Sequence, residues 1–100
     1  MNLKMNPEYE GFMQFQYMTL QGEIRITSDF VYLLRLKNFR EDVFKKFVNF
    51  IRKDKTIVVL SVTNESLYQN LMRIGFVSHY GTVQGLKKKY RRSLFKEQWH

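Results

Sequence analysis

Apolar residues occur along the chain in short blocks, and their spacing changes from one block to the next. Residues 11–20 are almost all apolar or glutamine, residues 23–26 alternate between polar and apolar side chains, and residues 30–36 are strongly apolar. Short apolar runs and strict alternation are both typical of strands. We therefore expect three strands, the first two forming an antiparallel hairpin with a tight turn at Gln21 and Gly22.

The next block changes to helical spacing. Asn38 and Glu41 are three residues apart, as in a capping box, in which each side chain accepts a hydrogen bond from a free backbone N–H group. The apolar residues that follow recur every three or four positions: Val43, Phe44, Phe47, Val48 and Ile51. Charged residues occupy most of the positions between them, so we expect an amphipathic helix of about four turns.

Residues 56–62 are β-branched or apolar at nearly every position, which is typical of a central strand that is covered on both faces. Because a helix connects this strand to residues 30–36, the two strands should pair in parallel through a right-handed crossover. Thr63 and Asn64 can cap a second helix that runs to residue 74. Gly75 suits the left-handed position that ends a helix.

The remaining apolar residues predict a last β region, at 76–80 and then at 82–86. The expected fold is therefore α/β (α+β), a mixed sheet with two helices in the order β-β-β-α-β-α-β(-β). One hundred residues, of which 44% are hydrophobic, suffice for one domain with its own core. We expect an N-terminal arm at 1–10, the domain at 11–86 and a basic tail at 87–100.

Positive charge is concentrated in that tail. Residues 87–97 contain six cations, against the single acid Glu97, and account for +5 of the net charge of +8. The cations are Lys87, Lys88, Lys89, Arg91, Arg92 and Lys96. Interleaved with Tyr90 and Phe95, they are suited to bind DNA or RNA phosphates and to stack on exposed bases. The alternative is a solubilising chain end whose aromatic residues fold back onto the sheet.

Composition excludes several other classes of chemistry. The chain has no cysteine and only two histidines, so neither a disulfide nor a metal site is expected. The apolar run at 56–62 is much shorter than the roughly 20 residues of a membrane-spanning helix. The amino terminus lacks the pattern of a signal peptide, so a cytoplasmic location is expected.

Residues 64–76 resemble a late motif of the GNAT acetyltransferase superfamily, Asn-x-x-Ala-x-x-x-Tyr-x-Lys-x-Gly-Phe. Four residues fall at matching positions: Asn64, Arg73, Gly75 and Phe76. Leu67 replaces the usual small residue, and Leu71 replaces the tyrosine. The motif covers 13 residues, and a compatible order of elements extends over residues 11–86, which corresponds to the core and C-terminal half of a GNAT domain.

The resemblance implies a parallel strand pair that separates just before Asn64, which would then be the residue most like an acetyl-CoA contact. Helix capping is the alternative role of Asn64. In the family, a glycine-rich loop holds the pyrophosphate of the cofactor at a helix N-terminus. Here residues 37–42 have no glycine, a bulky Phe39 and two acids, Glu41 and Asp42. An active enzyme is therefore not expected.

The tyrosine position concerns catalysis, because in the family this residue often protonates the leaving thiolate. Leu71 has no proton to donate, and Tyr68, one helical turn earlier, is the only weak catalytic candidate. If the chain is an enzyme, the resemblance implies a minimal N-acetyltransferase that uses acetyl-CoA.

The chain is also similar to small GNAT-like internal virion proteins of short-tailed bacteriophages, which lack the catalytic residues. The similarity lies in residues 27–29, in the run Phe44-Lys45-Lys46-Phe47 and in residues 64–75. It implies a non-catalytic structural protein of a virion, or of a bacterial cytoplasm, that contacts other protein subunits. A nucleic-acid-binding protein and an acetyltransferase are the alternatives, and a homo-oligomer is compatible with an exposed sheet edge.

Overall fold

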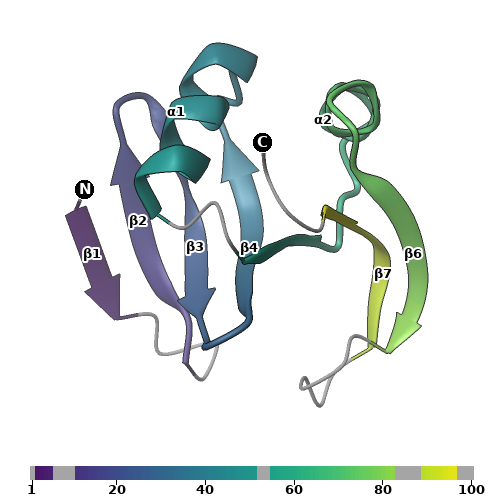
Figure 1. The fold of residues 1–100 in the computed structure, drawn as a ribbon, viewed down its shortest axis with the longest axis horizontal. Coiled ribbons are helices and arrows are strands. Elements are labelled where there is room, and N and C mark those ends of the chain that lie inside the picture. Colours follow the sequence, from purple (N-terminus) through teal and green to yellow (C-terminus); the bar gives the residue numbers. More distant parts are fainter. Residues whose placement is uncertain (1, 6–10, 52–54, 83–88, 97–100) are drawn as a thin grey trace.

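A computed structural model describes residues 2–5, 11–51, 55–82 and 89–96. These residues contain seven strands and two helices (Figure 1). In chain order they are β1 (Asn2–Met5), β2 (Met13–Tyr17), β3 (Leu20–Ile26), β4 (Phe30–Lys37), α1 (Glu41–Ile51), β5 (Thr56–Leu60), α2 (Glu65–Arg73), β6 (Val77–Thr82) and β7 (Lys89–Lys96). The mixed α+β fold with two helices is thereby confirmed.

The strands form one mixed sheet in the order β1-β2-β3-β4-β5-β7-β6. Strands β1 to β4 are antiparallel neighbours, whereas β4 and β5 pair in parallel, from Phe30 opposite Thr56 to Leu34 opposite Leu60. Because α1 returns the chain to the same end of the sheet, β5 must run in the direction of β4. The predicted parallel pair is thus confirmed.

The sheet extends beyond both of the expected domain boundaries. The segment predicted as an N-terminal arm contains β1, which pairs with β2. The segment predicted as a basic tail contains β7, which lies between β5 and β6. The sequence did not predict β7, because cations occupy half of its positions and no apolar alternation is apparent. Residues 83–86 of the expected last strand lie outside the described residues.

The first hairpin turns three residues earlier than predicted. Tyr17 pairs with Leu20, so the turn is at Met18 and Thr19, and Met18 adopts a left-handed backbone with φ of 52°. Gln21 and Gly22 instead lie inside β3. Glycine signalled a turn in the sequence, but its role in the sheet is to leave space for neighbouring side chains, as described below.

The start of α1 also differs from the prediction. The helix begins at Glu41, and the Phe44 backbone N–H donates to the Arg40 carbonyl oxygen at 2.8 Å, which makes Arg40 the residue before the first turn. Asn38 lies further upstream with φ of 58°, a left-handed conformation that asparagine tolerates better than most residues. The proposed capping box between Asn38 and Glu41 is therefore wrong.

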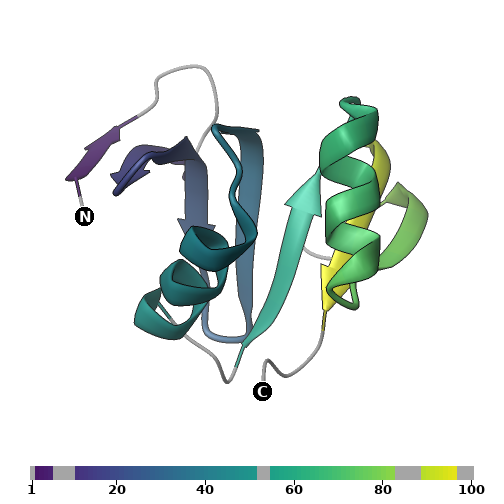
Figure 2. The same ribbon diagram turned by 90° about the horizontal axis from the view of Figure 1, so that it is seen from above.

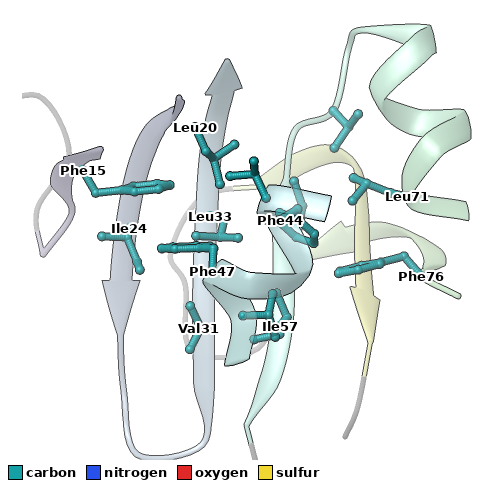
Figure 3. Packing of buried hydrophobic residues seen from close by; sticks show 14 residues of the cluster. Phe15, Leu20, Ile24, Val31, Leu33, Phe44, Phe47, Ile57, Leu71 and Phe76 are labelled. Atoms are coloured by element: carbon teal, nitrogen blue, oxygen red, sulfur yellow. The ribbon is translucent and has the colours of Figure 1, made fainter. Parts of the chain in front are cut away.

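The two faces of the central strands bury separate apolar clusters. One cluster joins the sheet to both helices and includes Phe44 and Phe47 from α1, Leu71 from α2, and Phe76 (Figure 3). In it, Phe47 stacks on Phe15 with ring centroids 4.8 Å apart. We call this side of the sheet the helix face.

The opposite side, here called the open face, has a smaller cluster to which neither helix contributes. Its buried members are Phe12, Tyr32, Leu34, Val58 and Leu60. Alternate residues of β4 and β5 thus enter alternate clusters, as the apolar character of both faces predicts. Within the described residues, no helix is long and apolar enough to cross a membrane.

Candidate functional site

The parallel strands β4 and β5 separate toward their carboxyl ends, and the candidate site lies around this divergence point (Figure 2). Their paired residues end with Leu34 and Leu60. The next residue on each strand has a left-handed backbone, with φ of 54° at Arg35 and 49° at Ser61. This conformation costs a non-glycine residue about 1–2 kcal/mol. Strain of this kind is often found at functional sites.

The N-terminus of α1 is the place where the family resemblance puts a bound pyrophosphate. Phe39 lies here partly buried against the helix-face cluster, with its ring centroid 5.1 Å from that of Phe44. The side chain that the sequence identified as bulky is therefore a packing residue, two positions before the helix begins. A glycine at this position would let a ligand approach the backbone closely, whereas the Phe39 side chain takes up space here.

Two carboxylates of the chain itself occupy the first turn of α1. Asp42 Oδ2 lies 3.1 Å from Arg40 Nη2, and Glu41 Oε1 lies 3.5 Å from Arg73 Nη2 at the end of α2. Glu41 Oε2 is also 3.7 Å from Lys45 Nζ. Exposed pairs of this kind stabilise a fold by only about 0–1 kcal/mol. Both carboxylates lie at the helix end that attracts anions, so they compete with an incoming phosphate for this end.

Asn64 is the N-cap of α2. Its side-chain oxygen accepts a hydrogen bond from the Leu67 backbone N–H at 2.9 Å, and its backbone oxygen accepts one from the Tyr68 N–H at 3.0 Å. The helix-capping interpretation of Asn64 is thereby confirmed. The exposed Asn64 side chain uses its oxygen in this cap, so its amide group is what remains for a ligand.

The position of the family tyrosine lies in the core. Leu71 is fully buried in the helix-face cluster, together with Phe44 and Phe76. Tyr68 is partly buried and packs against the same cluster. Its environment is that of an amphipathic residue at a helix edge, a common position for tyrosine in packing.

Four of the six predicted nucleic-acid contacts belong to β7: Lys89, Arg91, Arg92 and Lys96. Lys87 and Lys88 lie outside the described residues. The backbone of β7 pairs with β6 from Lys89 to Phe95, and with β5 from Leu94 to Lys96. The basic segment is thus part of the sheet at the divergence point, because its first half continues past the end of β5.

Sequence reasoning missed an ion pair next to the divergence point. Glu23 is buried, with 6% of its surface exposed, and its Oε1 atom lies 3.8 Å from Arg35 Nη1. In the sequence, Glu23 belongs to an alternating strand whose polar side is ordinarily exposed. Only the pairing of β3 with β4 reveals the burial. Among the described residues, no group of three or more potential metal ligands is found.

Comparison of the chain with protein-family models, with curated proteins and with solved structures returned no match. The interpretation of the site therefore depends on the geometry described above.

Proposed function

We infer that this chain is a non-catalytic GNAT-like domain that serves as a structural or interaction protein, in a bacteriophage virion or in the bacterial cytoplasm. One observation carries the proposal: Phe39, Glu41 and Asp42 lie at the α1 N-terminus, and both carboxylates are held there by ion pairs, Glu41 with Arg73 and Asp42 with Arg40. An anion-binding helix end requires bare N–H groups and no competing acid.

Two further features support the GNAT-like part of the proposal. The parallel strands β4 and β5 diverge just before the helix that Asn64 caps, in keeping with the family resemblance. The burial of Leu71 supports the non-catalytic part, because no titratable group stands at that position. What remains is a compact scaffold whose surfaces contact other protein subunits.

Calorimetric titration with acetyl-CoA tests the non-catalytic assignment. We expect no heat of binding and no shift of the melting temperature at millimolar ligand. Binding would be readily detected, because a ligand at 100 times its Kd stabilises a fold by about 2.7 kcal/mol. A catalytically active GNAT enzyme is the positive control. Saturable binding of acetyl-CoA by the wild-type chain would refute the assignment, and so would transfer of the acetyl group from acetyl-CoA to an amine.

A variant tests whether the occupied helix end is the cause. The combined change Phe39→Gly, Glu41→Gln and Asp42→Asn removes the ring and both charges and leaves the fully buried residues of the helix-face cluster, such as Leu71, unchanged. Weak CoA binding by this variant alone would identify these three residues as the barrier. Its melting temperature, measured in parallel, shows whether the variant is still folded.

Nucleic-acid binding is the second candidate, favoured by the net charge of +5 in residues 87–97. Electrostatic binding should weaken steeply between 50 and 200 mM salt, by roughly 10³-fold if six phosphates are contacted. Changing Lys87 and Lys88 to glutamine should reduce the slope of log affinity against log salt by about 2. The matched control removes two exposed charges from α1, Lys45 and Lys46, and should leave the slope unchanged.

A further inference from the structure

The strand β4 contains one extra residue opposite β3. Glu23 pairs with Leu34, whereas Gln21 pairs with Lys37, so two steps along β3 match three along β4. The irregularity is a β-bulge, a feature that redirects side chains and is often found beside binding sites. Arg35, with its left-handed backbone, lies within it.

The bulge decides which face of the sheet Arg35 joins. Leu34 belongs to the open-face cluster and Leu36 packs against the helix-face cluster, two residues apart on opposite faces. Regular alternation would put both leucines on one face. The extra residue, Arg35, is thus turned toward Glu23 and the open face, at the cost of backbone strain.

Glu23 adds a second unfavourable feature at the same place. Its carboxylate is buried between strands, 3.8 Å from the Arg35 guanidinium, and the Arg35 side chain is 52% exposed. Burying a charged group is costly even when it is paired, and an apolar residue at this position would avoid the cost. The pair thus holds an arginine side chain at the surface, next to a buried acid.

These residues border a hollow of about 650 Å³ over β2, β3 and β4. This size lies within the range of about 300–1,000 Å³ that is typical of small-molecule sites. The hollow is lined mainly by polar side chains: Gln14, Gln16, Gln21, Glu23, Arg35 and Lys37. Two cations and one acid leave a local charge of +1, and the three carboxamides supply hydrogen-bond donors and acceptors.

We propose that this hollow binds a carboxylate group, held by Arg35 and Lys37 and bordered by the glutamine amides. Arginine suits this role because its planar guanidinium presents paired N–H donors that match the two oxygens of a carboxylate. A free organic acid and the carboxyl terminus of a peptide share this chemistry. The site is separate from the α1 N-terminus, so the proposal goes beyond the function inferred above and does not rest on it.

Three probes distinguish the sources of the carboxylate: acetate, an acetylated tetra-alanine peptide with a free carboxyl end, and the same peptide amidated at that end. Binding to the full chain is measured by NMR titration of backbone amides in β2 to β4. We expect at least one of the two carboxylate probes, acetate or the free peptide, to bind. If a peptide is the source of the carboxylate, the amidated peptide should bind at least tenfold more weakly than the free peptide. Equal binding of the two peptides, or no binding of either carboxylate probe at about 10 mM, overturns the proposal.

Variants locate the site. Arg35→Gln and Lys37→Gln should each weaken binding at least tenfold, whereas Lys46→Gln, which removes an exposed cation from α1, should leave it unchanged. Melting temperatures of the three variants control for folding, and Lys37→Gln leaves the bulge residue in place. Unaltered affinity in both hollow variants would overturn the assignment to these side chains.

Discussion

At Gly22, a side chain would have almost no space. An added Cβ atom would lie 3.0 Å from Leu36 Cδ2, 3.1 Å from the Leu34 carbonyl oxygen and 3.1 Å from Phe15 Cε1. The Phe15 ring cannot easily withdraw, because it stacks on Phe47. Glycine is therefore required inside β3 by the close approach of its neighbours, even though its backbone is that of a strand.

Gly22→Ala should lower the free energy of unfolding by about 1 kcal/mol. Overpacking costs about 1–3 kcal/mol, which exceeds the ~0.4–1 kcal/mol gained by restricting the unfolded chain. Urea denaturation measures the difference. Gln21→Ala, at the adjacent exposed position, is the control and should change stability by no more than about 0.5 kcal/mol. An unchanged midpoint for the glycine variant would show that Leu36 can move aside.

Tyr32 brings a titratable group into the open-face cluster. It is 2% exposed, and its ring stacks near that of Phe30 at a centroid distance of 5.5 Å. Burial raises the pKa of the Tyr32 phenol above its usual value of 10, and the positive charge of Arg25 partly opposes the shift. The neutral phenol is thus the form that the fold favours.

Stability should consequently decline in strong base. Below pH 10 the phenol is protonated in both states and contributes no pH dependence. Above the pKa of the Tyr32 phenol in the unfolded chain, the unfolded chain loses this proton first. The free energy of unfolding therefore falls by up to ~1.4 kcal/mol per pH unit until the pKa of the phenol in the folded protein is reached. The difference in unfolding free energy between wild type and Tyr32→Phe, followed from pH 8 to 11, isolates this residue from the other tyrosines and the lysines. A constant difference across that range would contradict the assignment.

Helix α2 shows how far local sequence signals determine an element. Asn64 caps its beginning, and at its end the Gly75 N–H donates to the Met72 oxygen while the Phe76 N–H donates to the Leu71 oxygen. This is a Schellman motif, with Gly75 at φ of 103°. Every interaction here spans at most five residues, which is why the sequence predicted the cap and the end of this helix.

Asn64→Ala should destabilise the protein by about 1 kcal/mol, because the Leu67 N–H loses its acceptor. Asn64→Asp keeps an acceptor oxygen and adds a charge that the helix dipole favours, so it should retain or slightly raise stability. Thermal unfolding of the wild type and the two variants measures their order of stability. Equal losses in both variants would mean that the cap contributes nothing and that Asn64 has another role.

Elements that depend on distant partners were predicted less well. The bulge at Arg35 and the burial of Glu23 arise from the register between β3 and β4, and no residue pattern within either strand encodes that register. The capping box predicted at Asn38 was wrong for a related reason. The spacing of Asn38 to Glu41 fits a capping box, but the left-handed backbone of Asn38 places it outside the helix. The sequence located the α1 N-terminus and its unfavourable acids, but not the partners Arg40 and Arg73.

At the scale of the whole molecule, the two halves of the sheet depend on a strand that charge alone does not reveal. β7 pairs with β5 on one side and β6 on the other, so it connects the C-terminal hairpin to the rest of the sheet. Without it, β6 would have no strand partner among the described residues. The segment that the sequence presents as a solvated cationic end is thus required to complete the sheet.

A chain that ends at residue 88 should therefore fail to fold cooperatively. Removing β7 leaves one edge of β5 and both edges of β6 unpaired, and each exposed edge also promotes aggregation. A chain that ends at Lys96 keeps all seven strands and is the matched control. Circular dichroism and the dispersion of backbone amide signals in NMR spectra compare the two. If residues 87–100 were only a solubilising or nucleic-acid-binding tail, both truncated chains would melt at the temperature of the full protein. That result would contradict the sheet order, and the interpretation of the divergence point depends on this order.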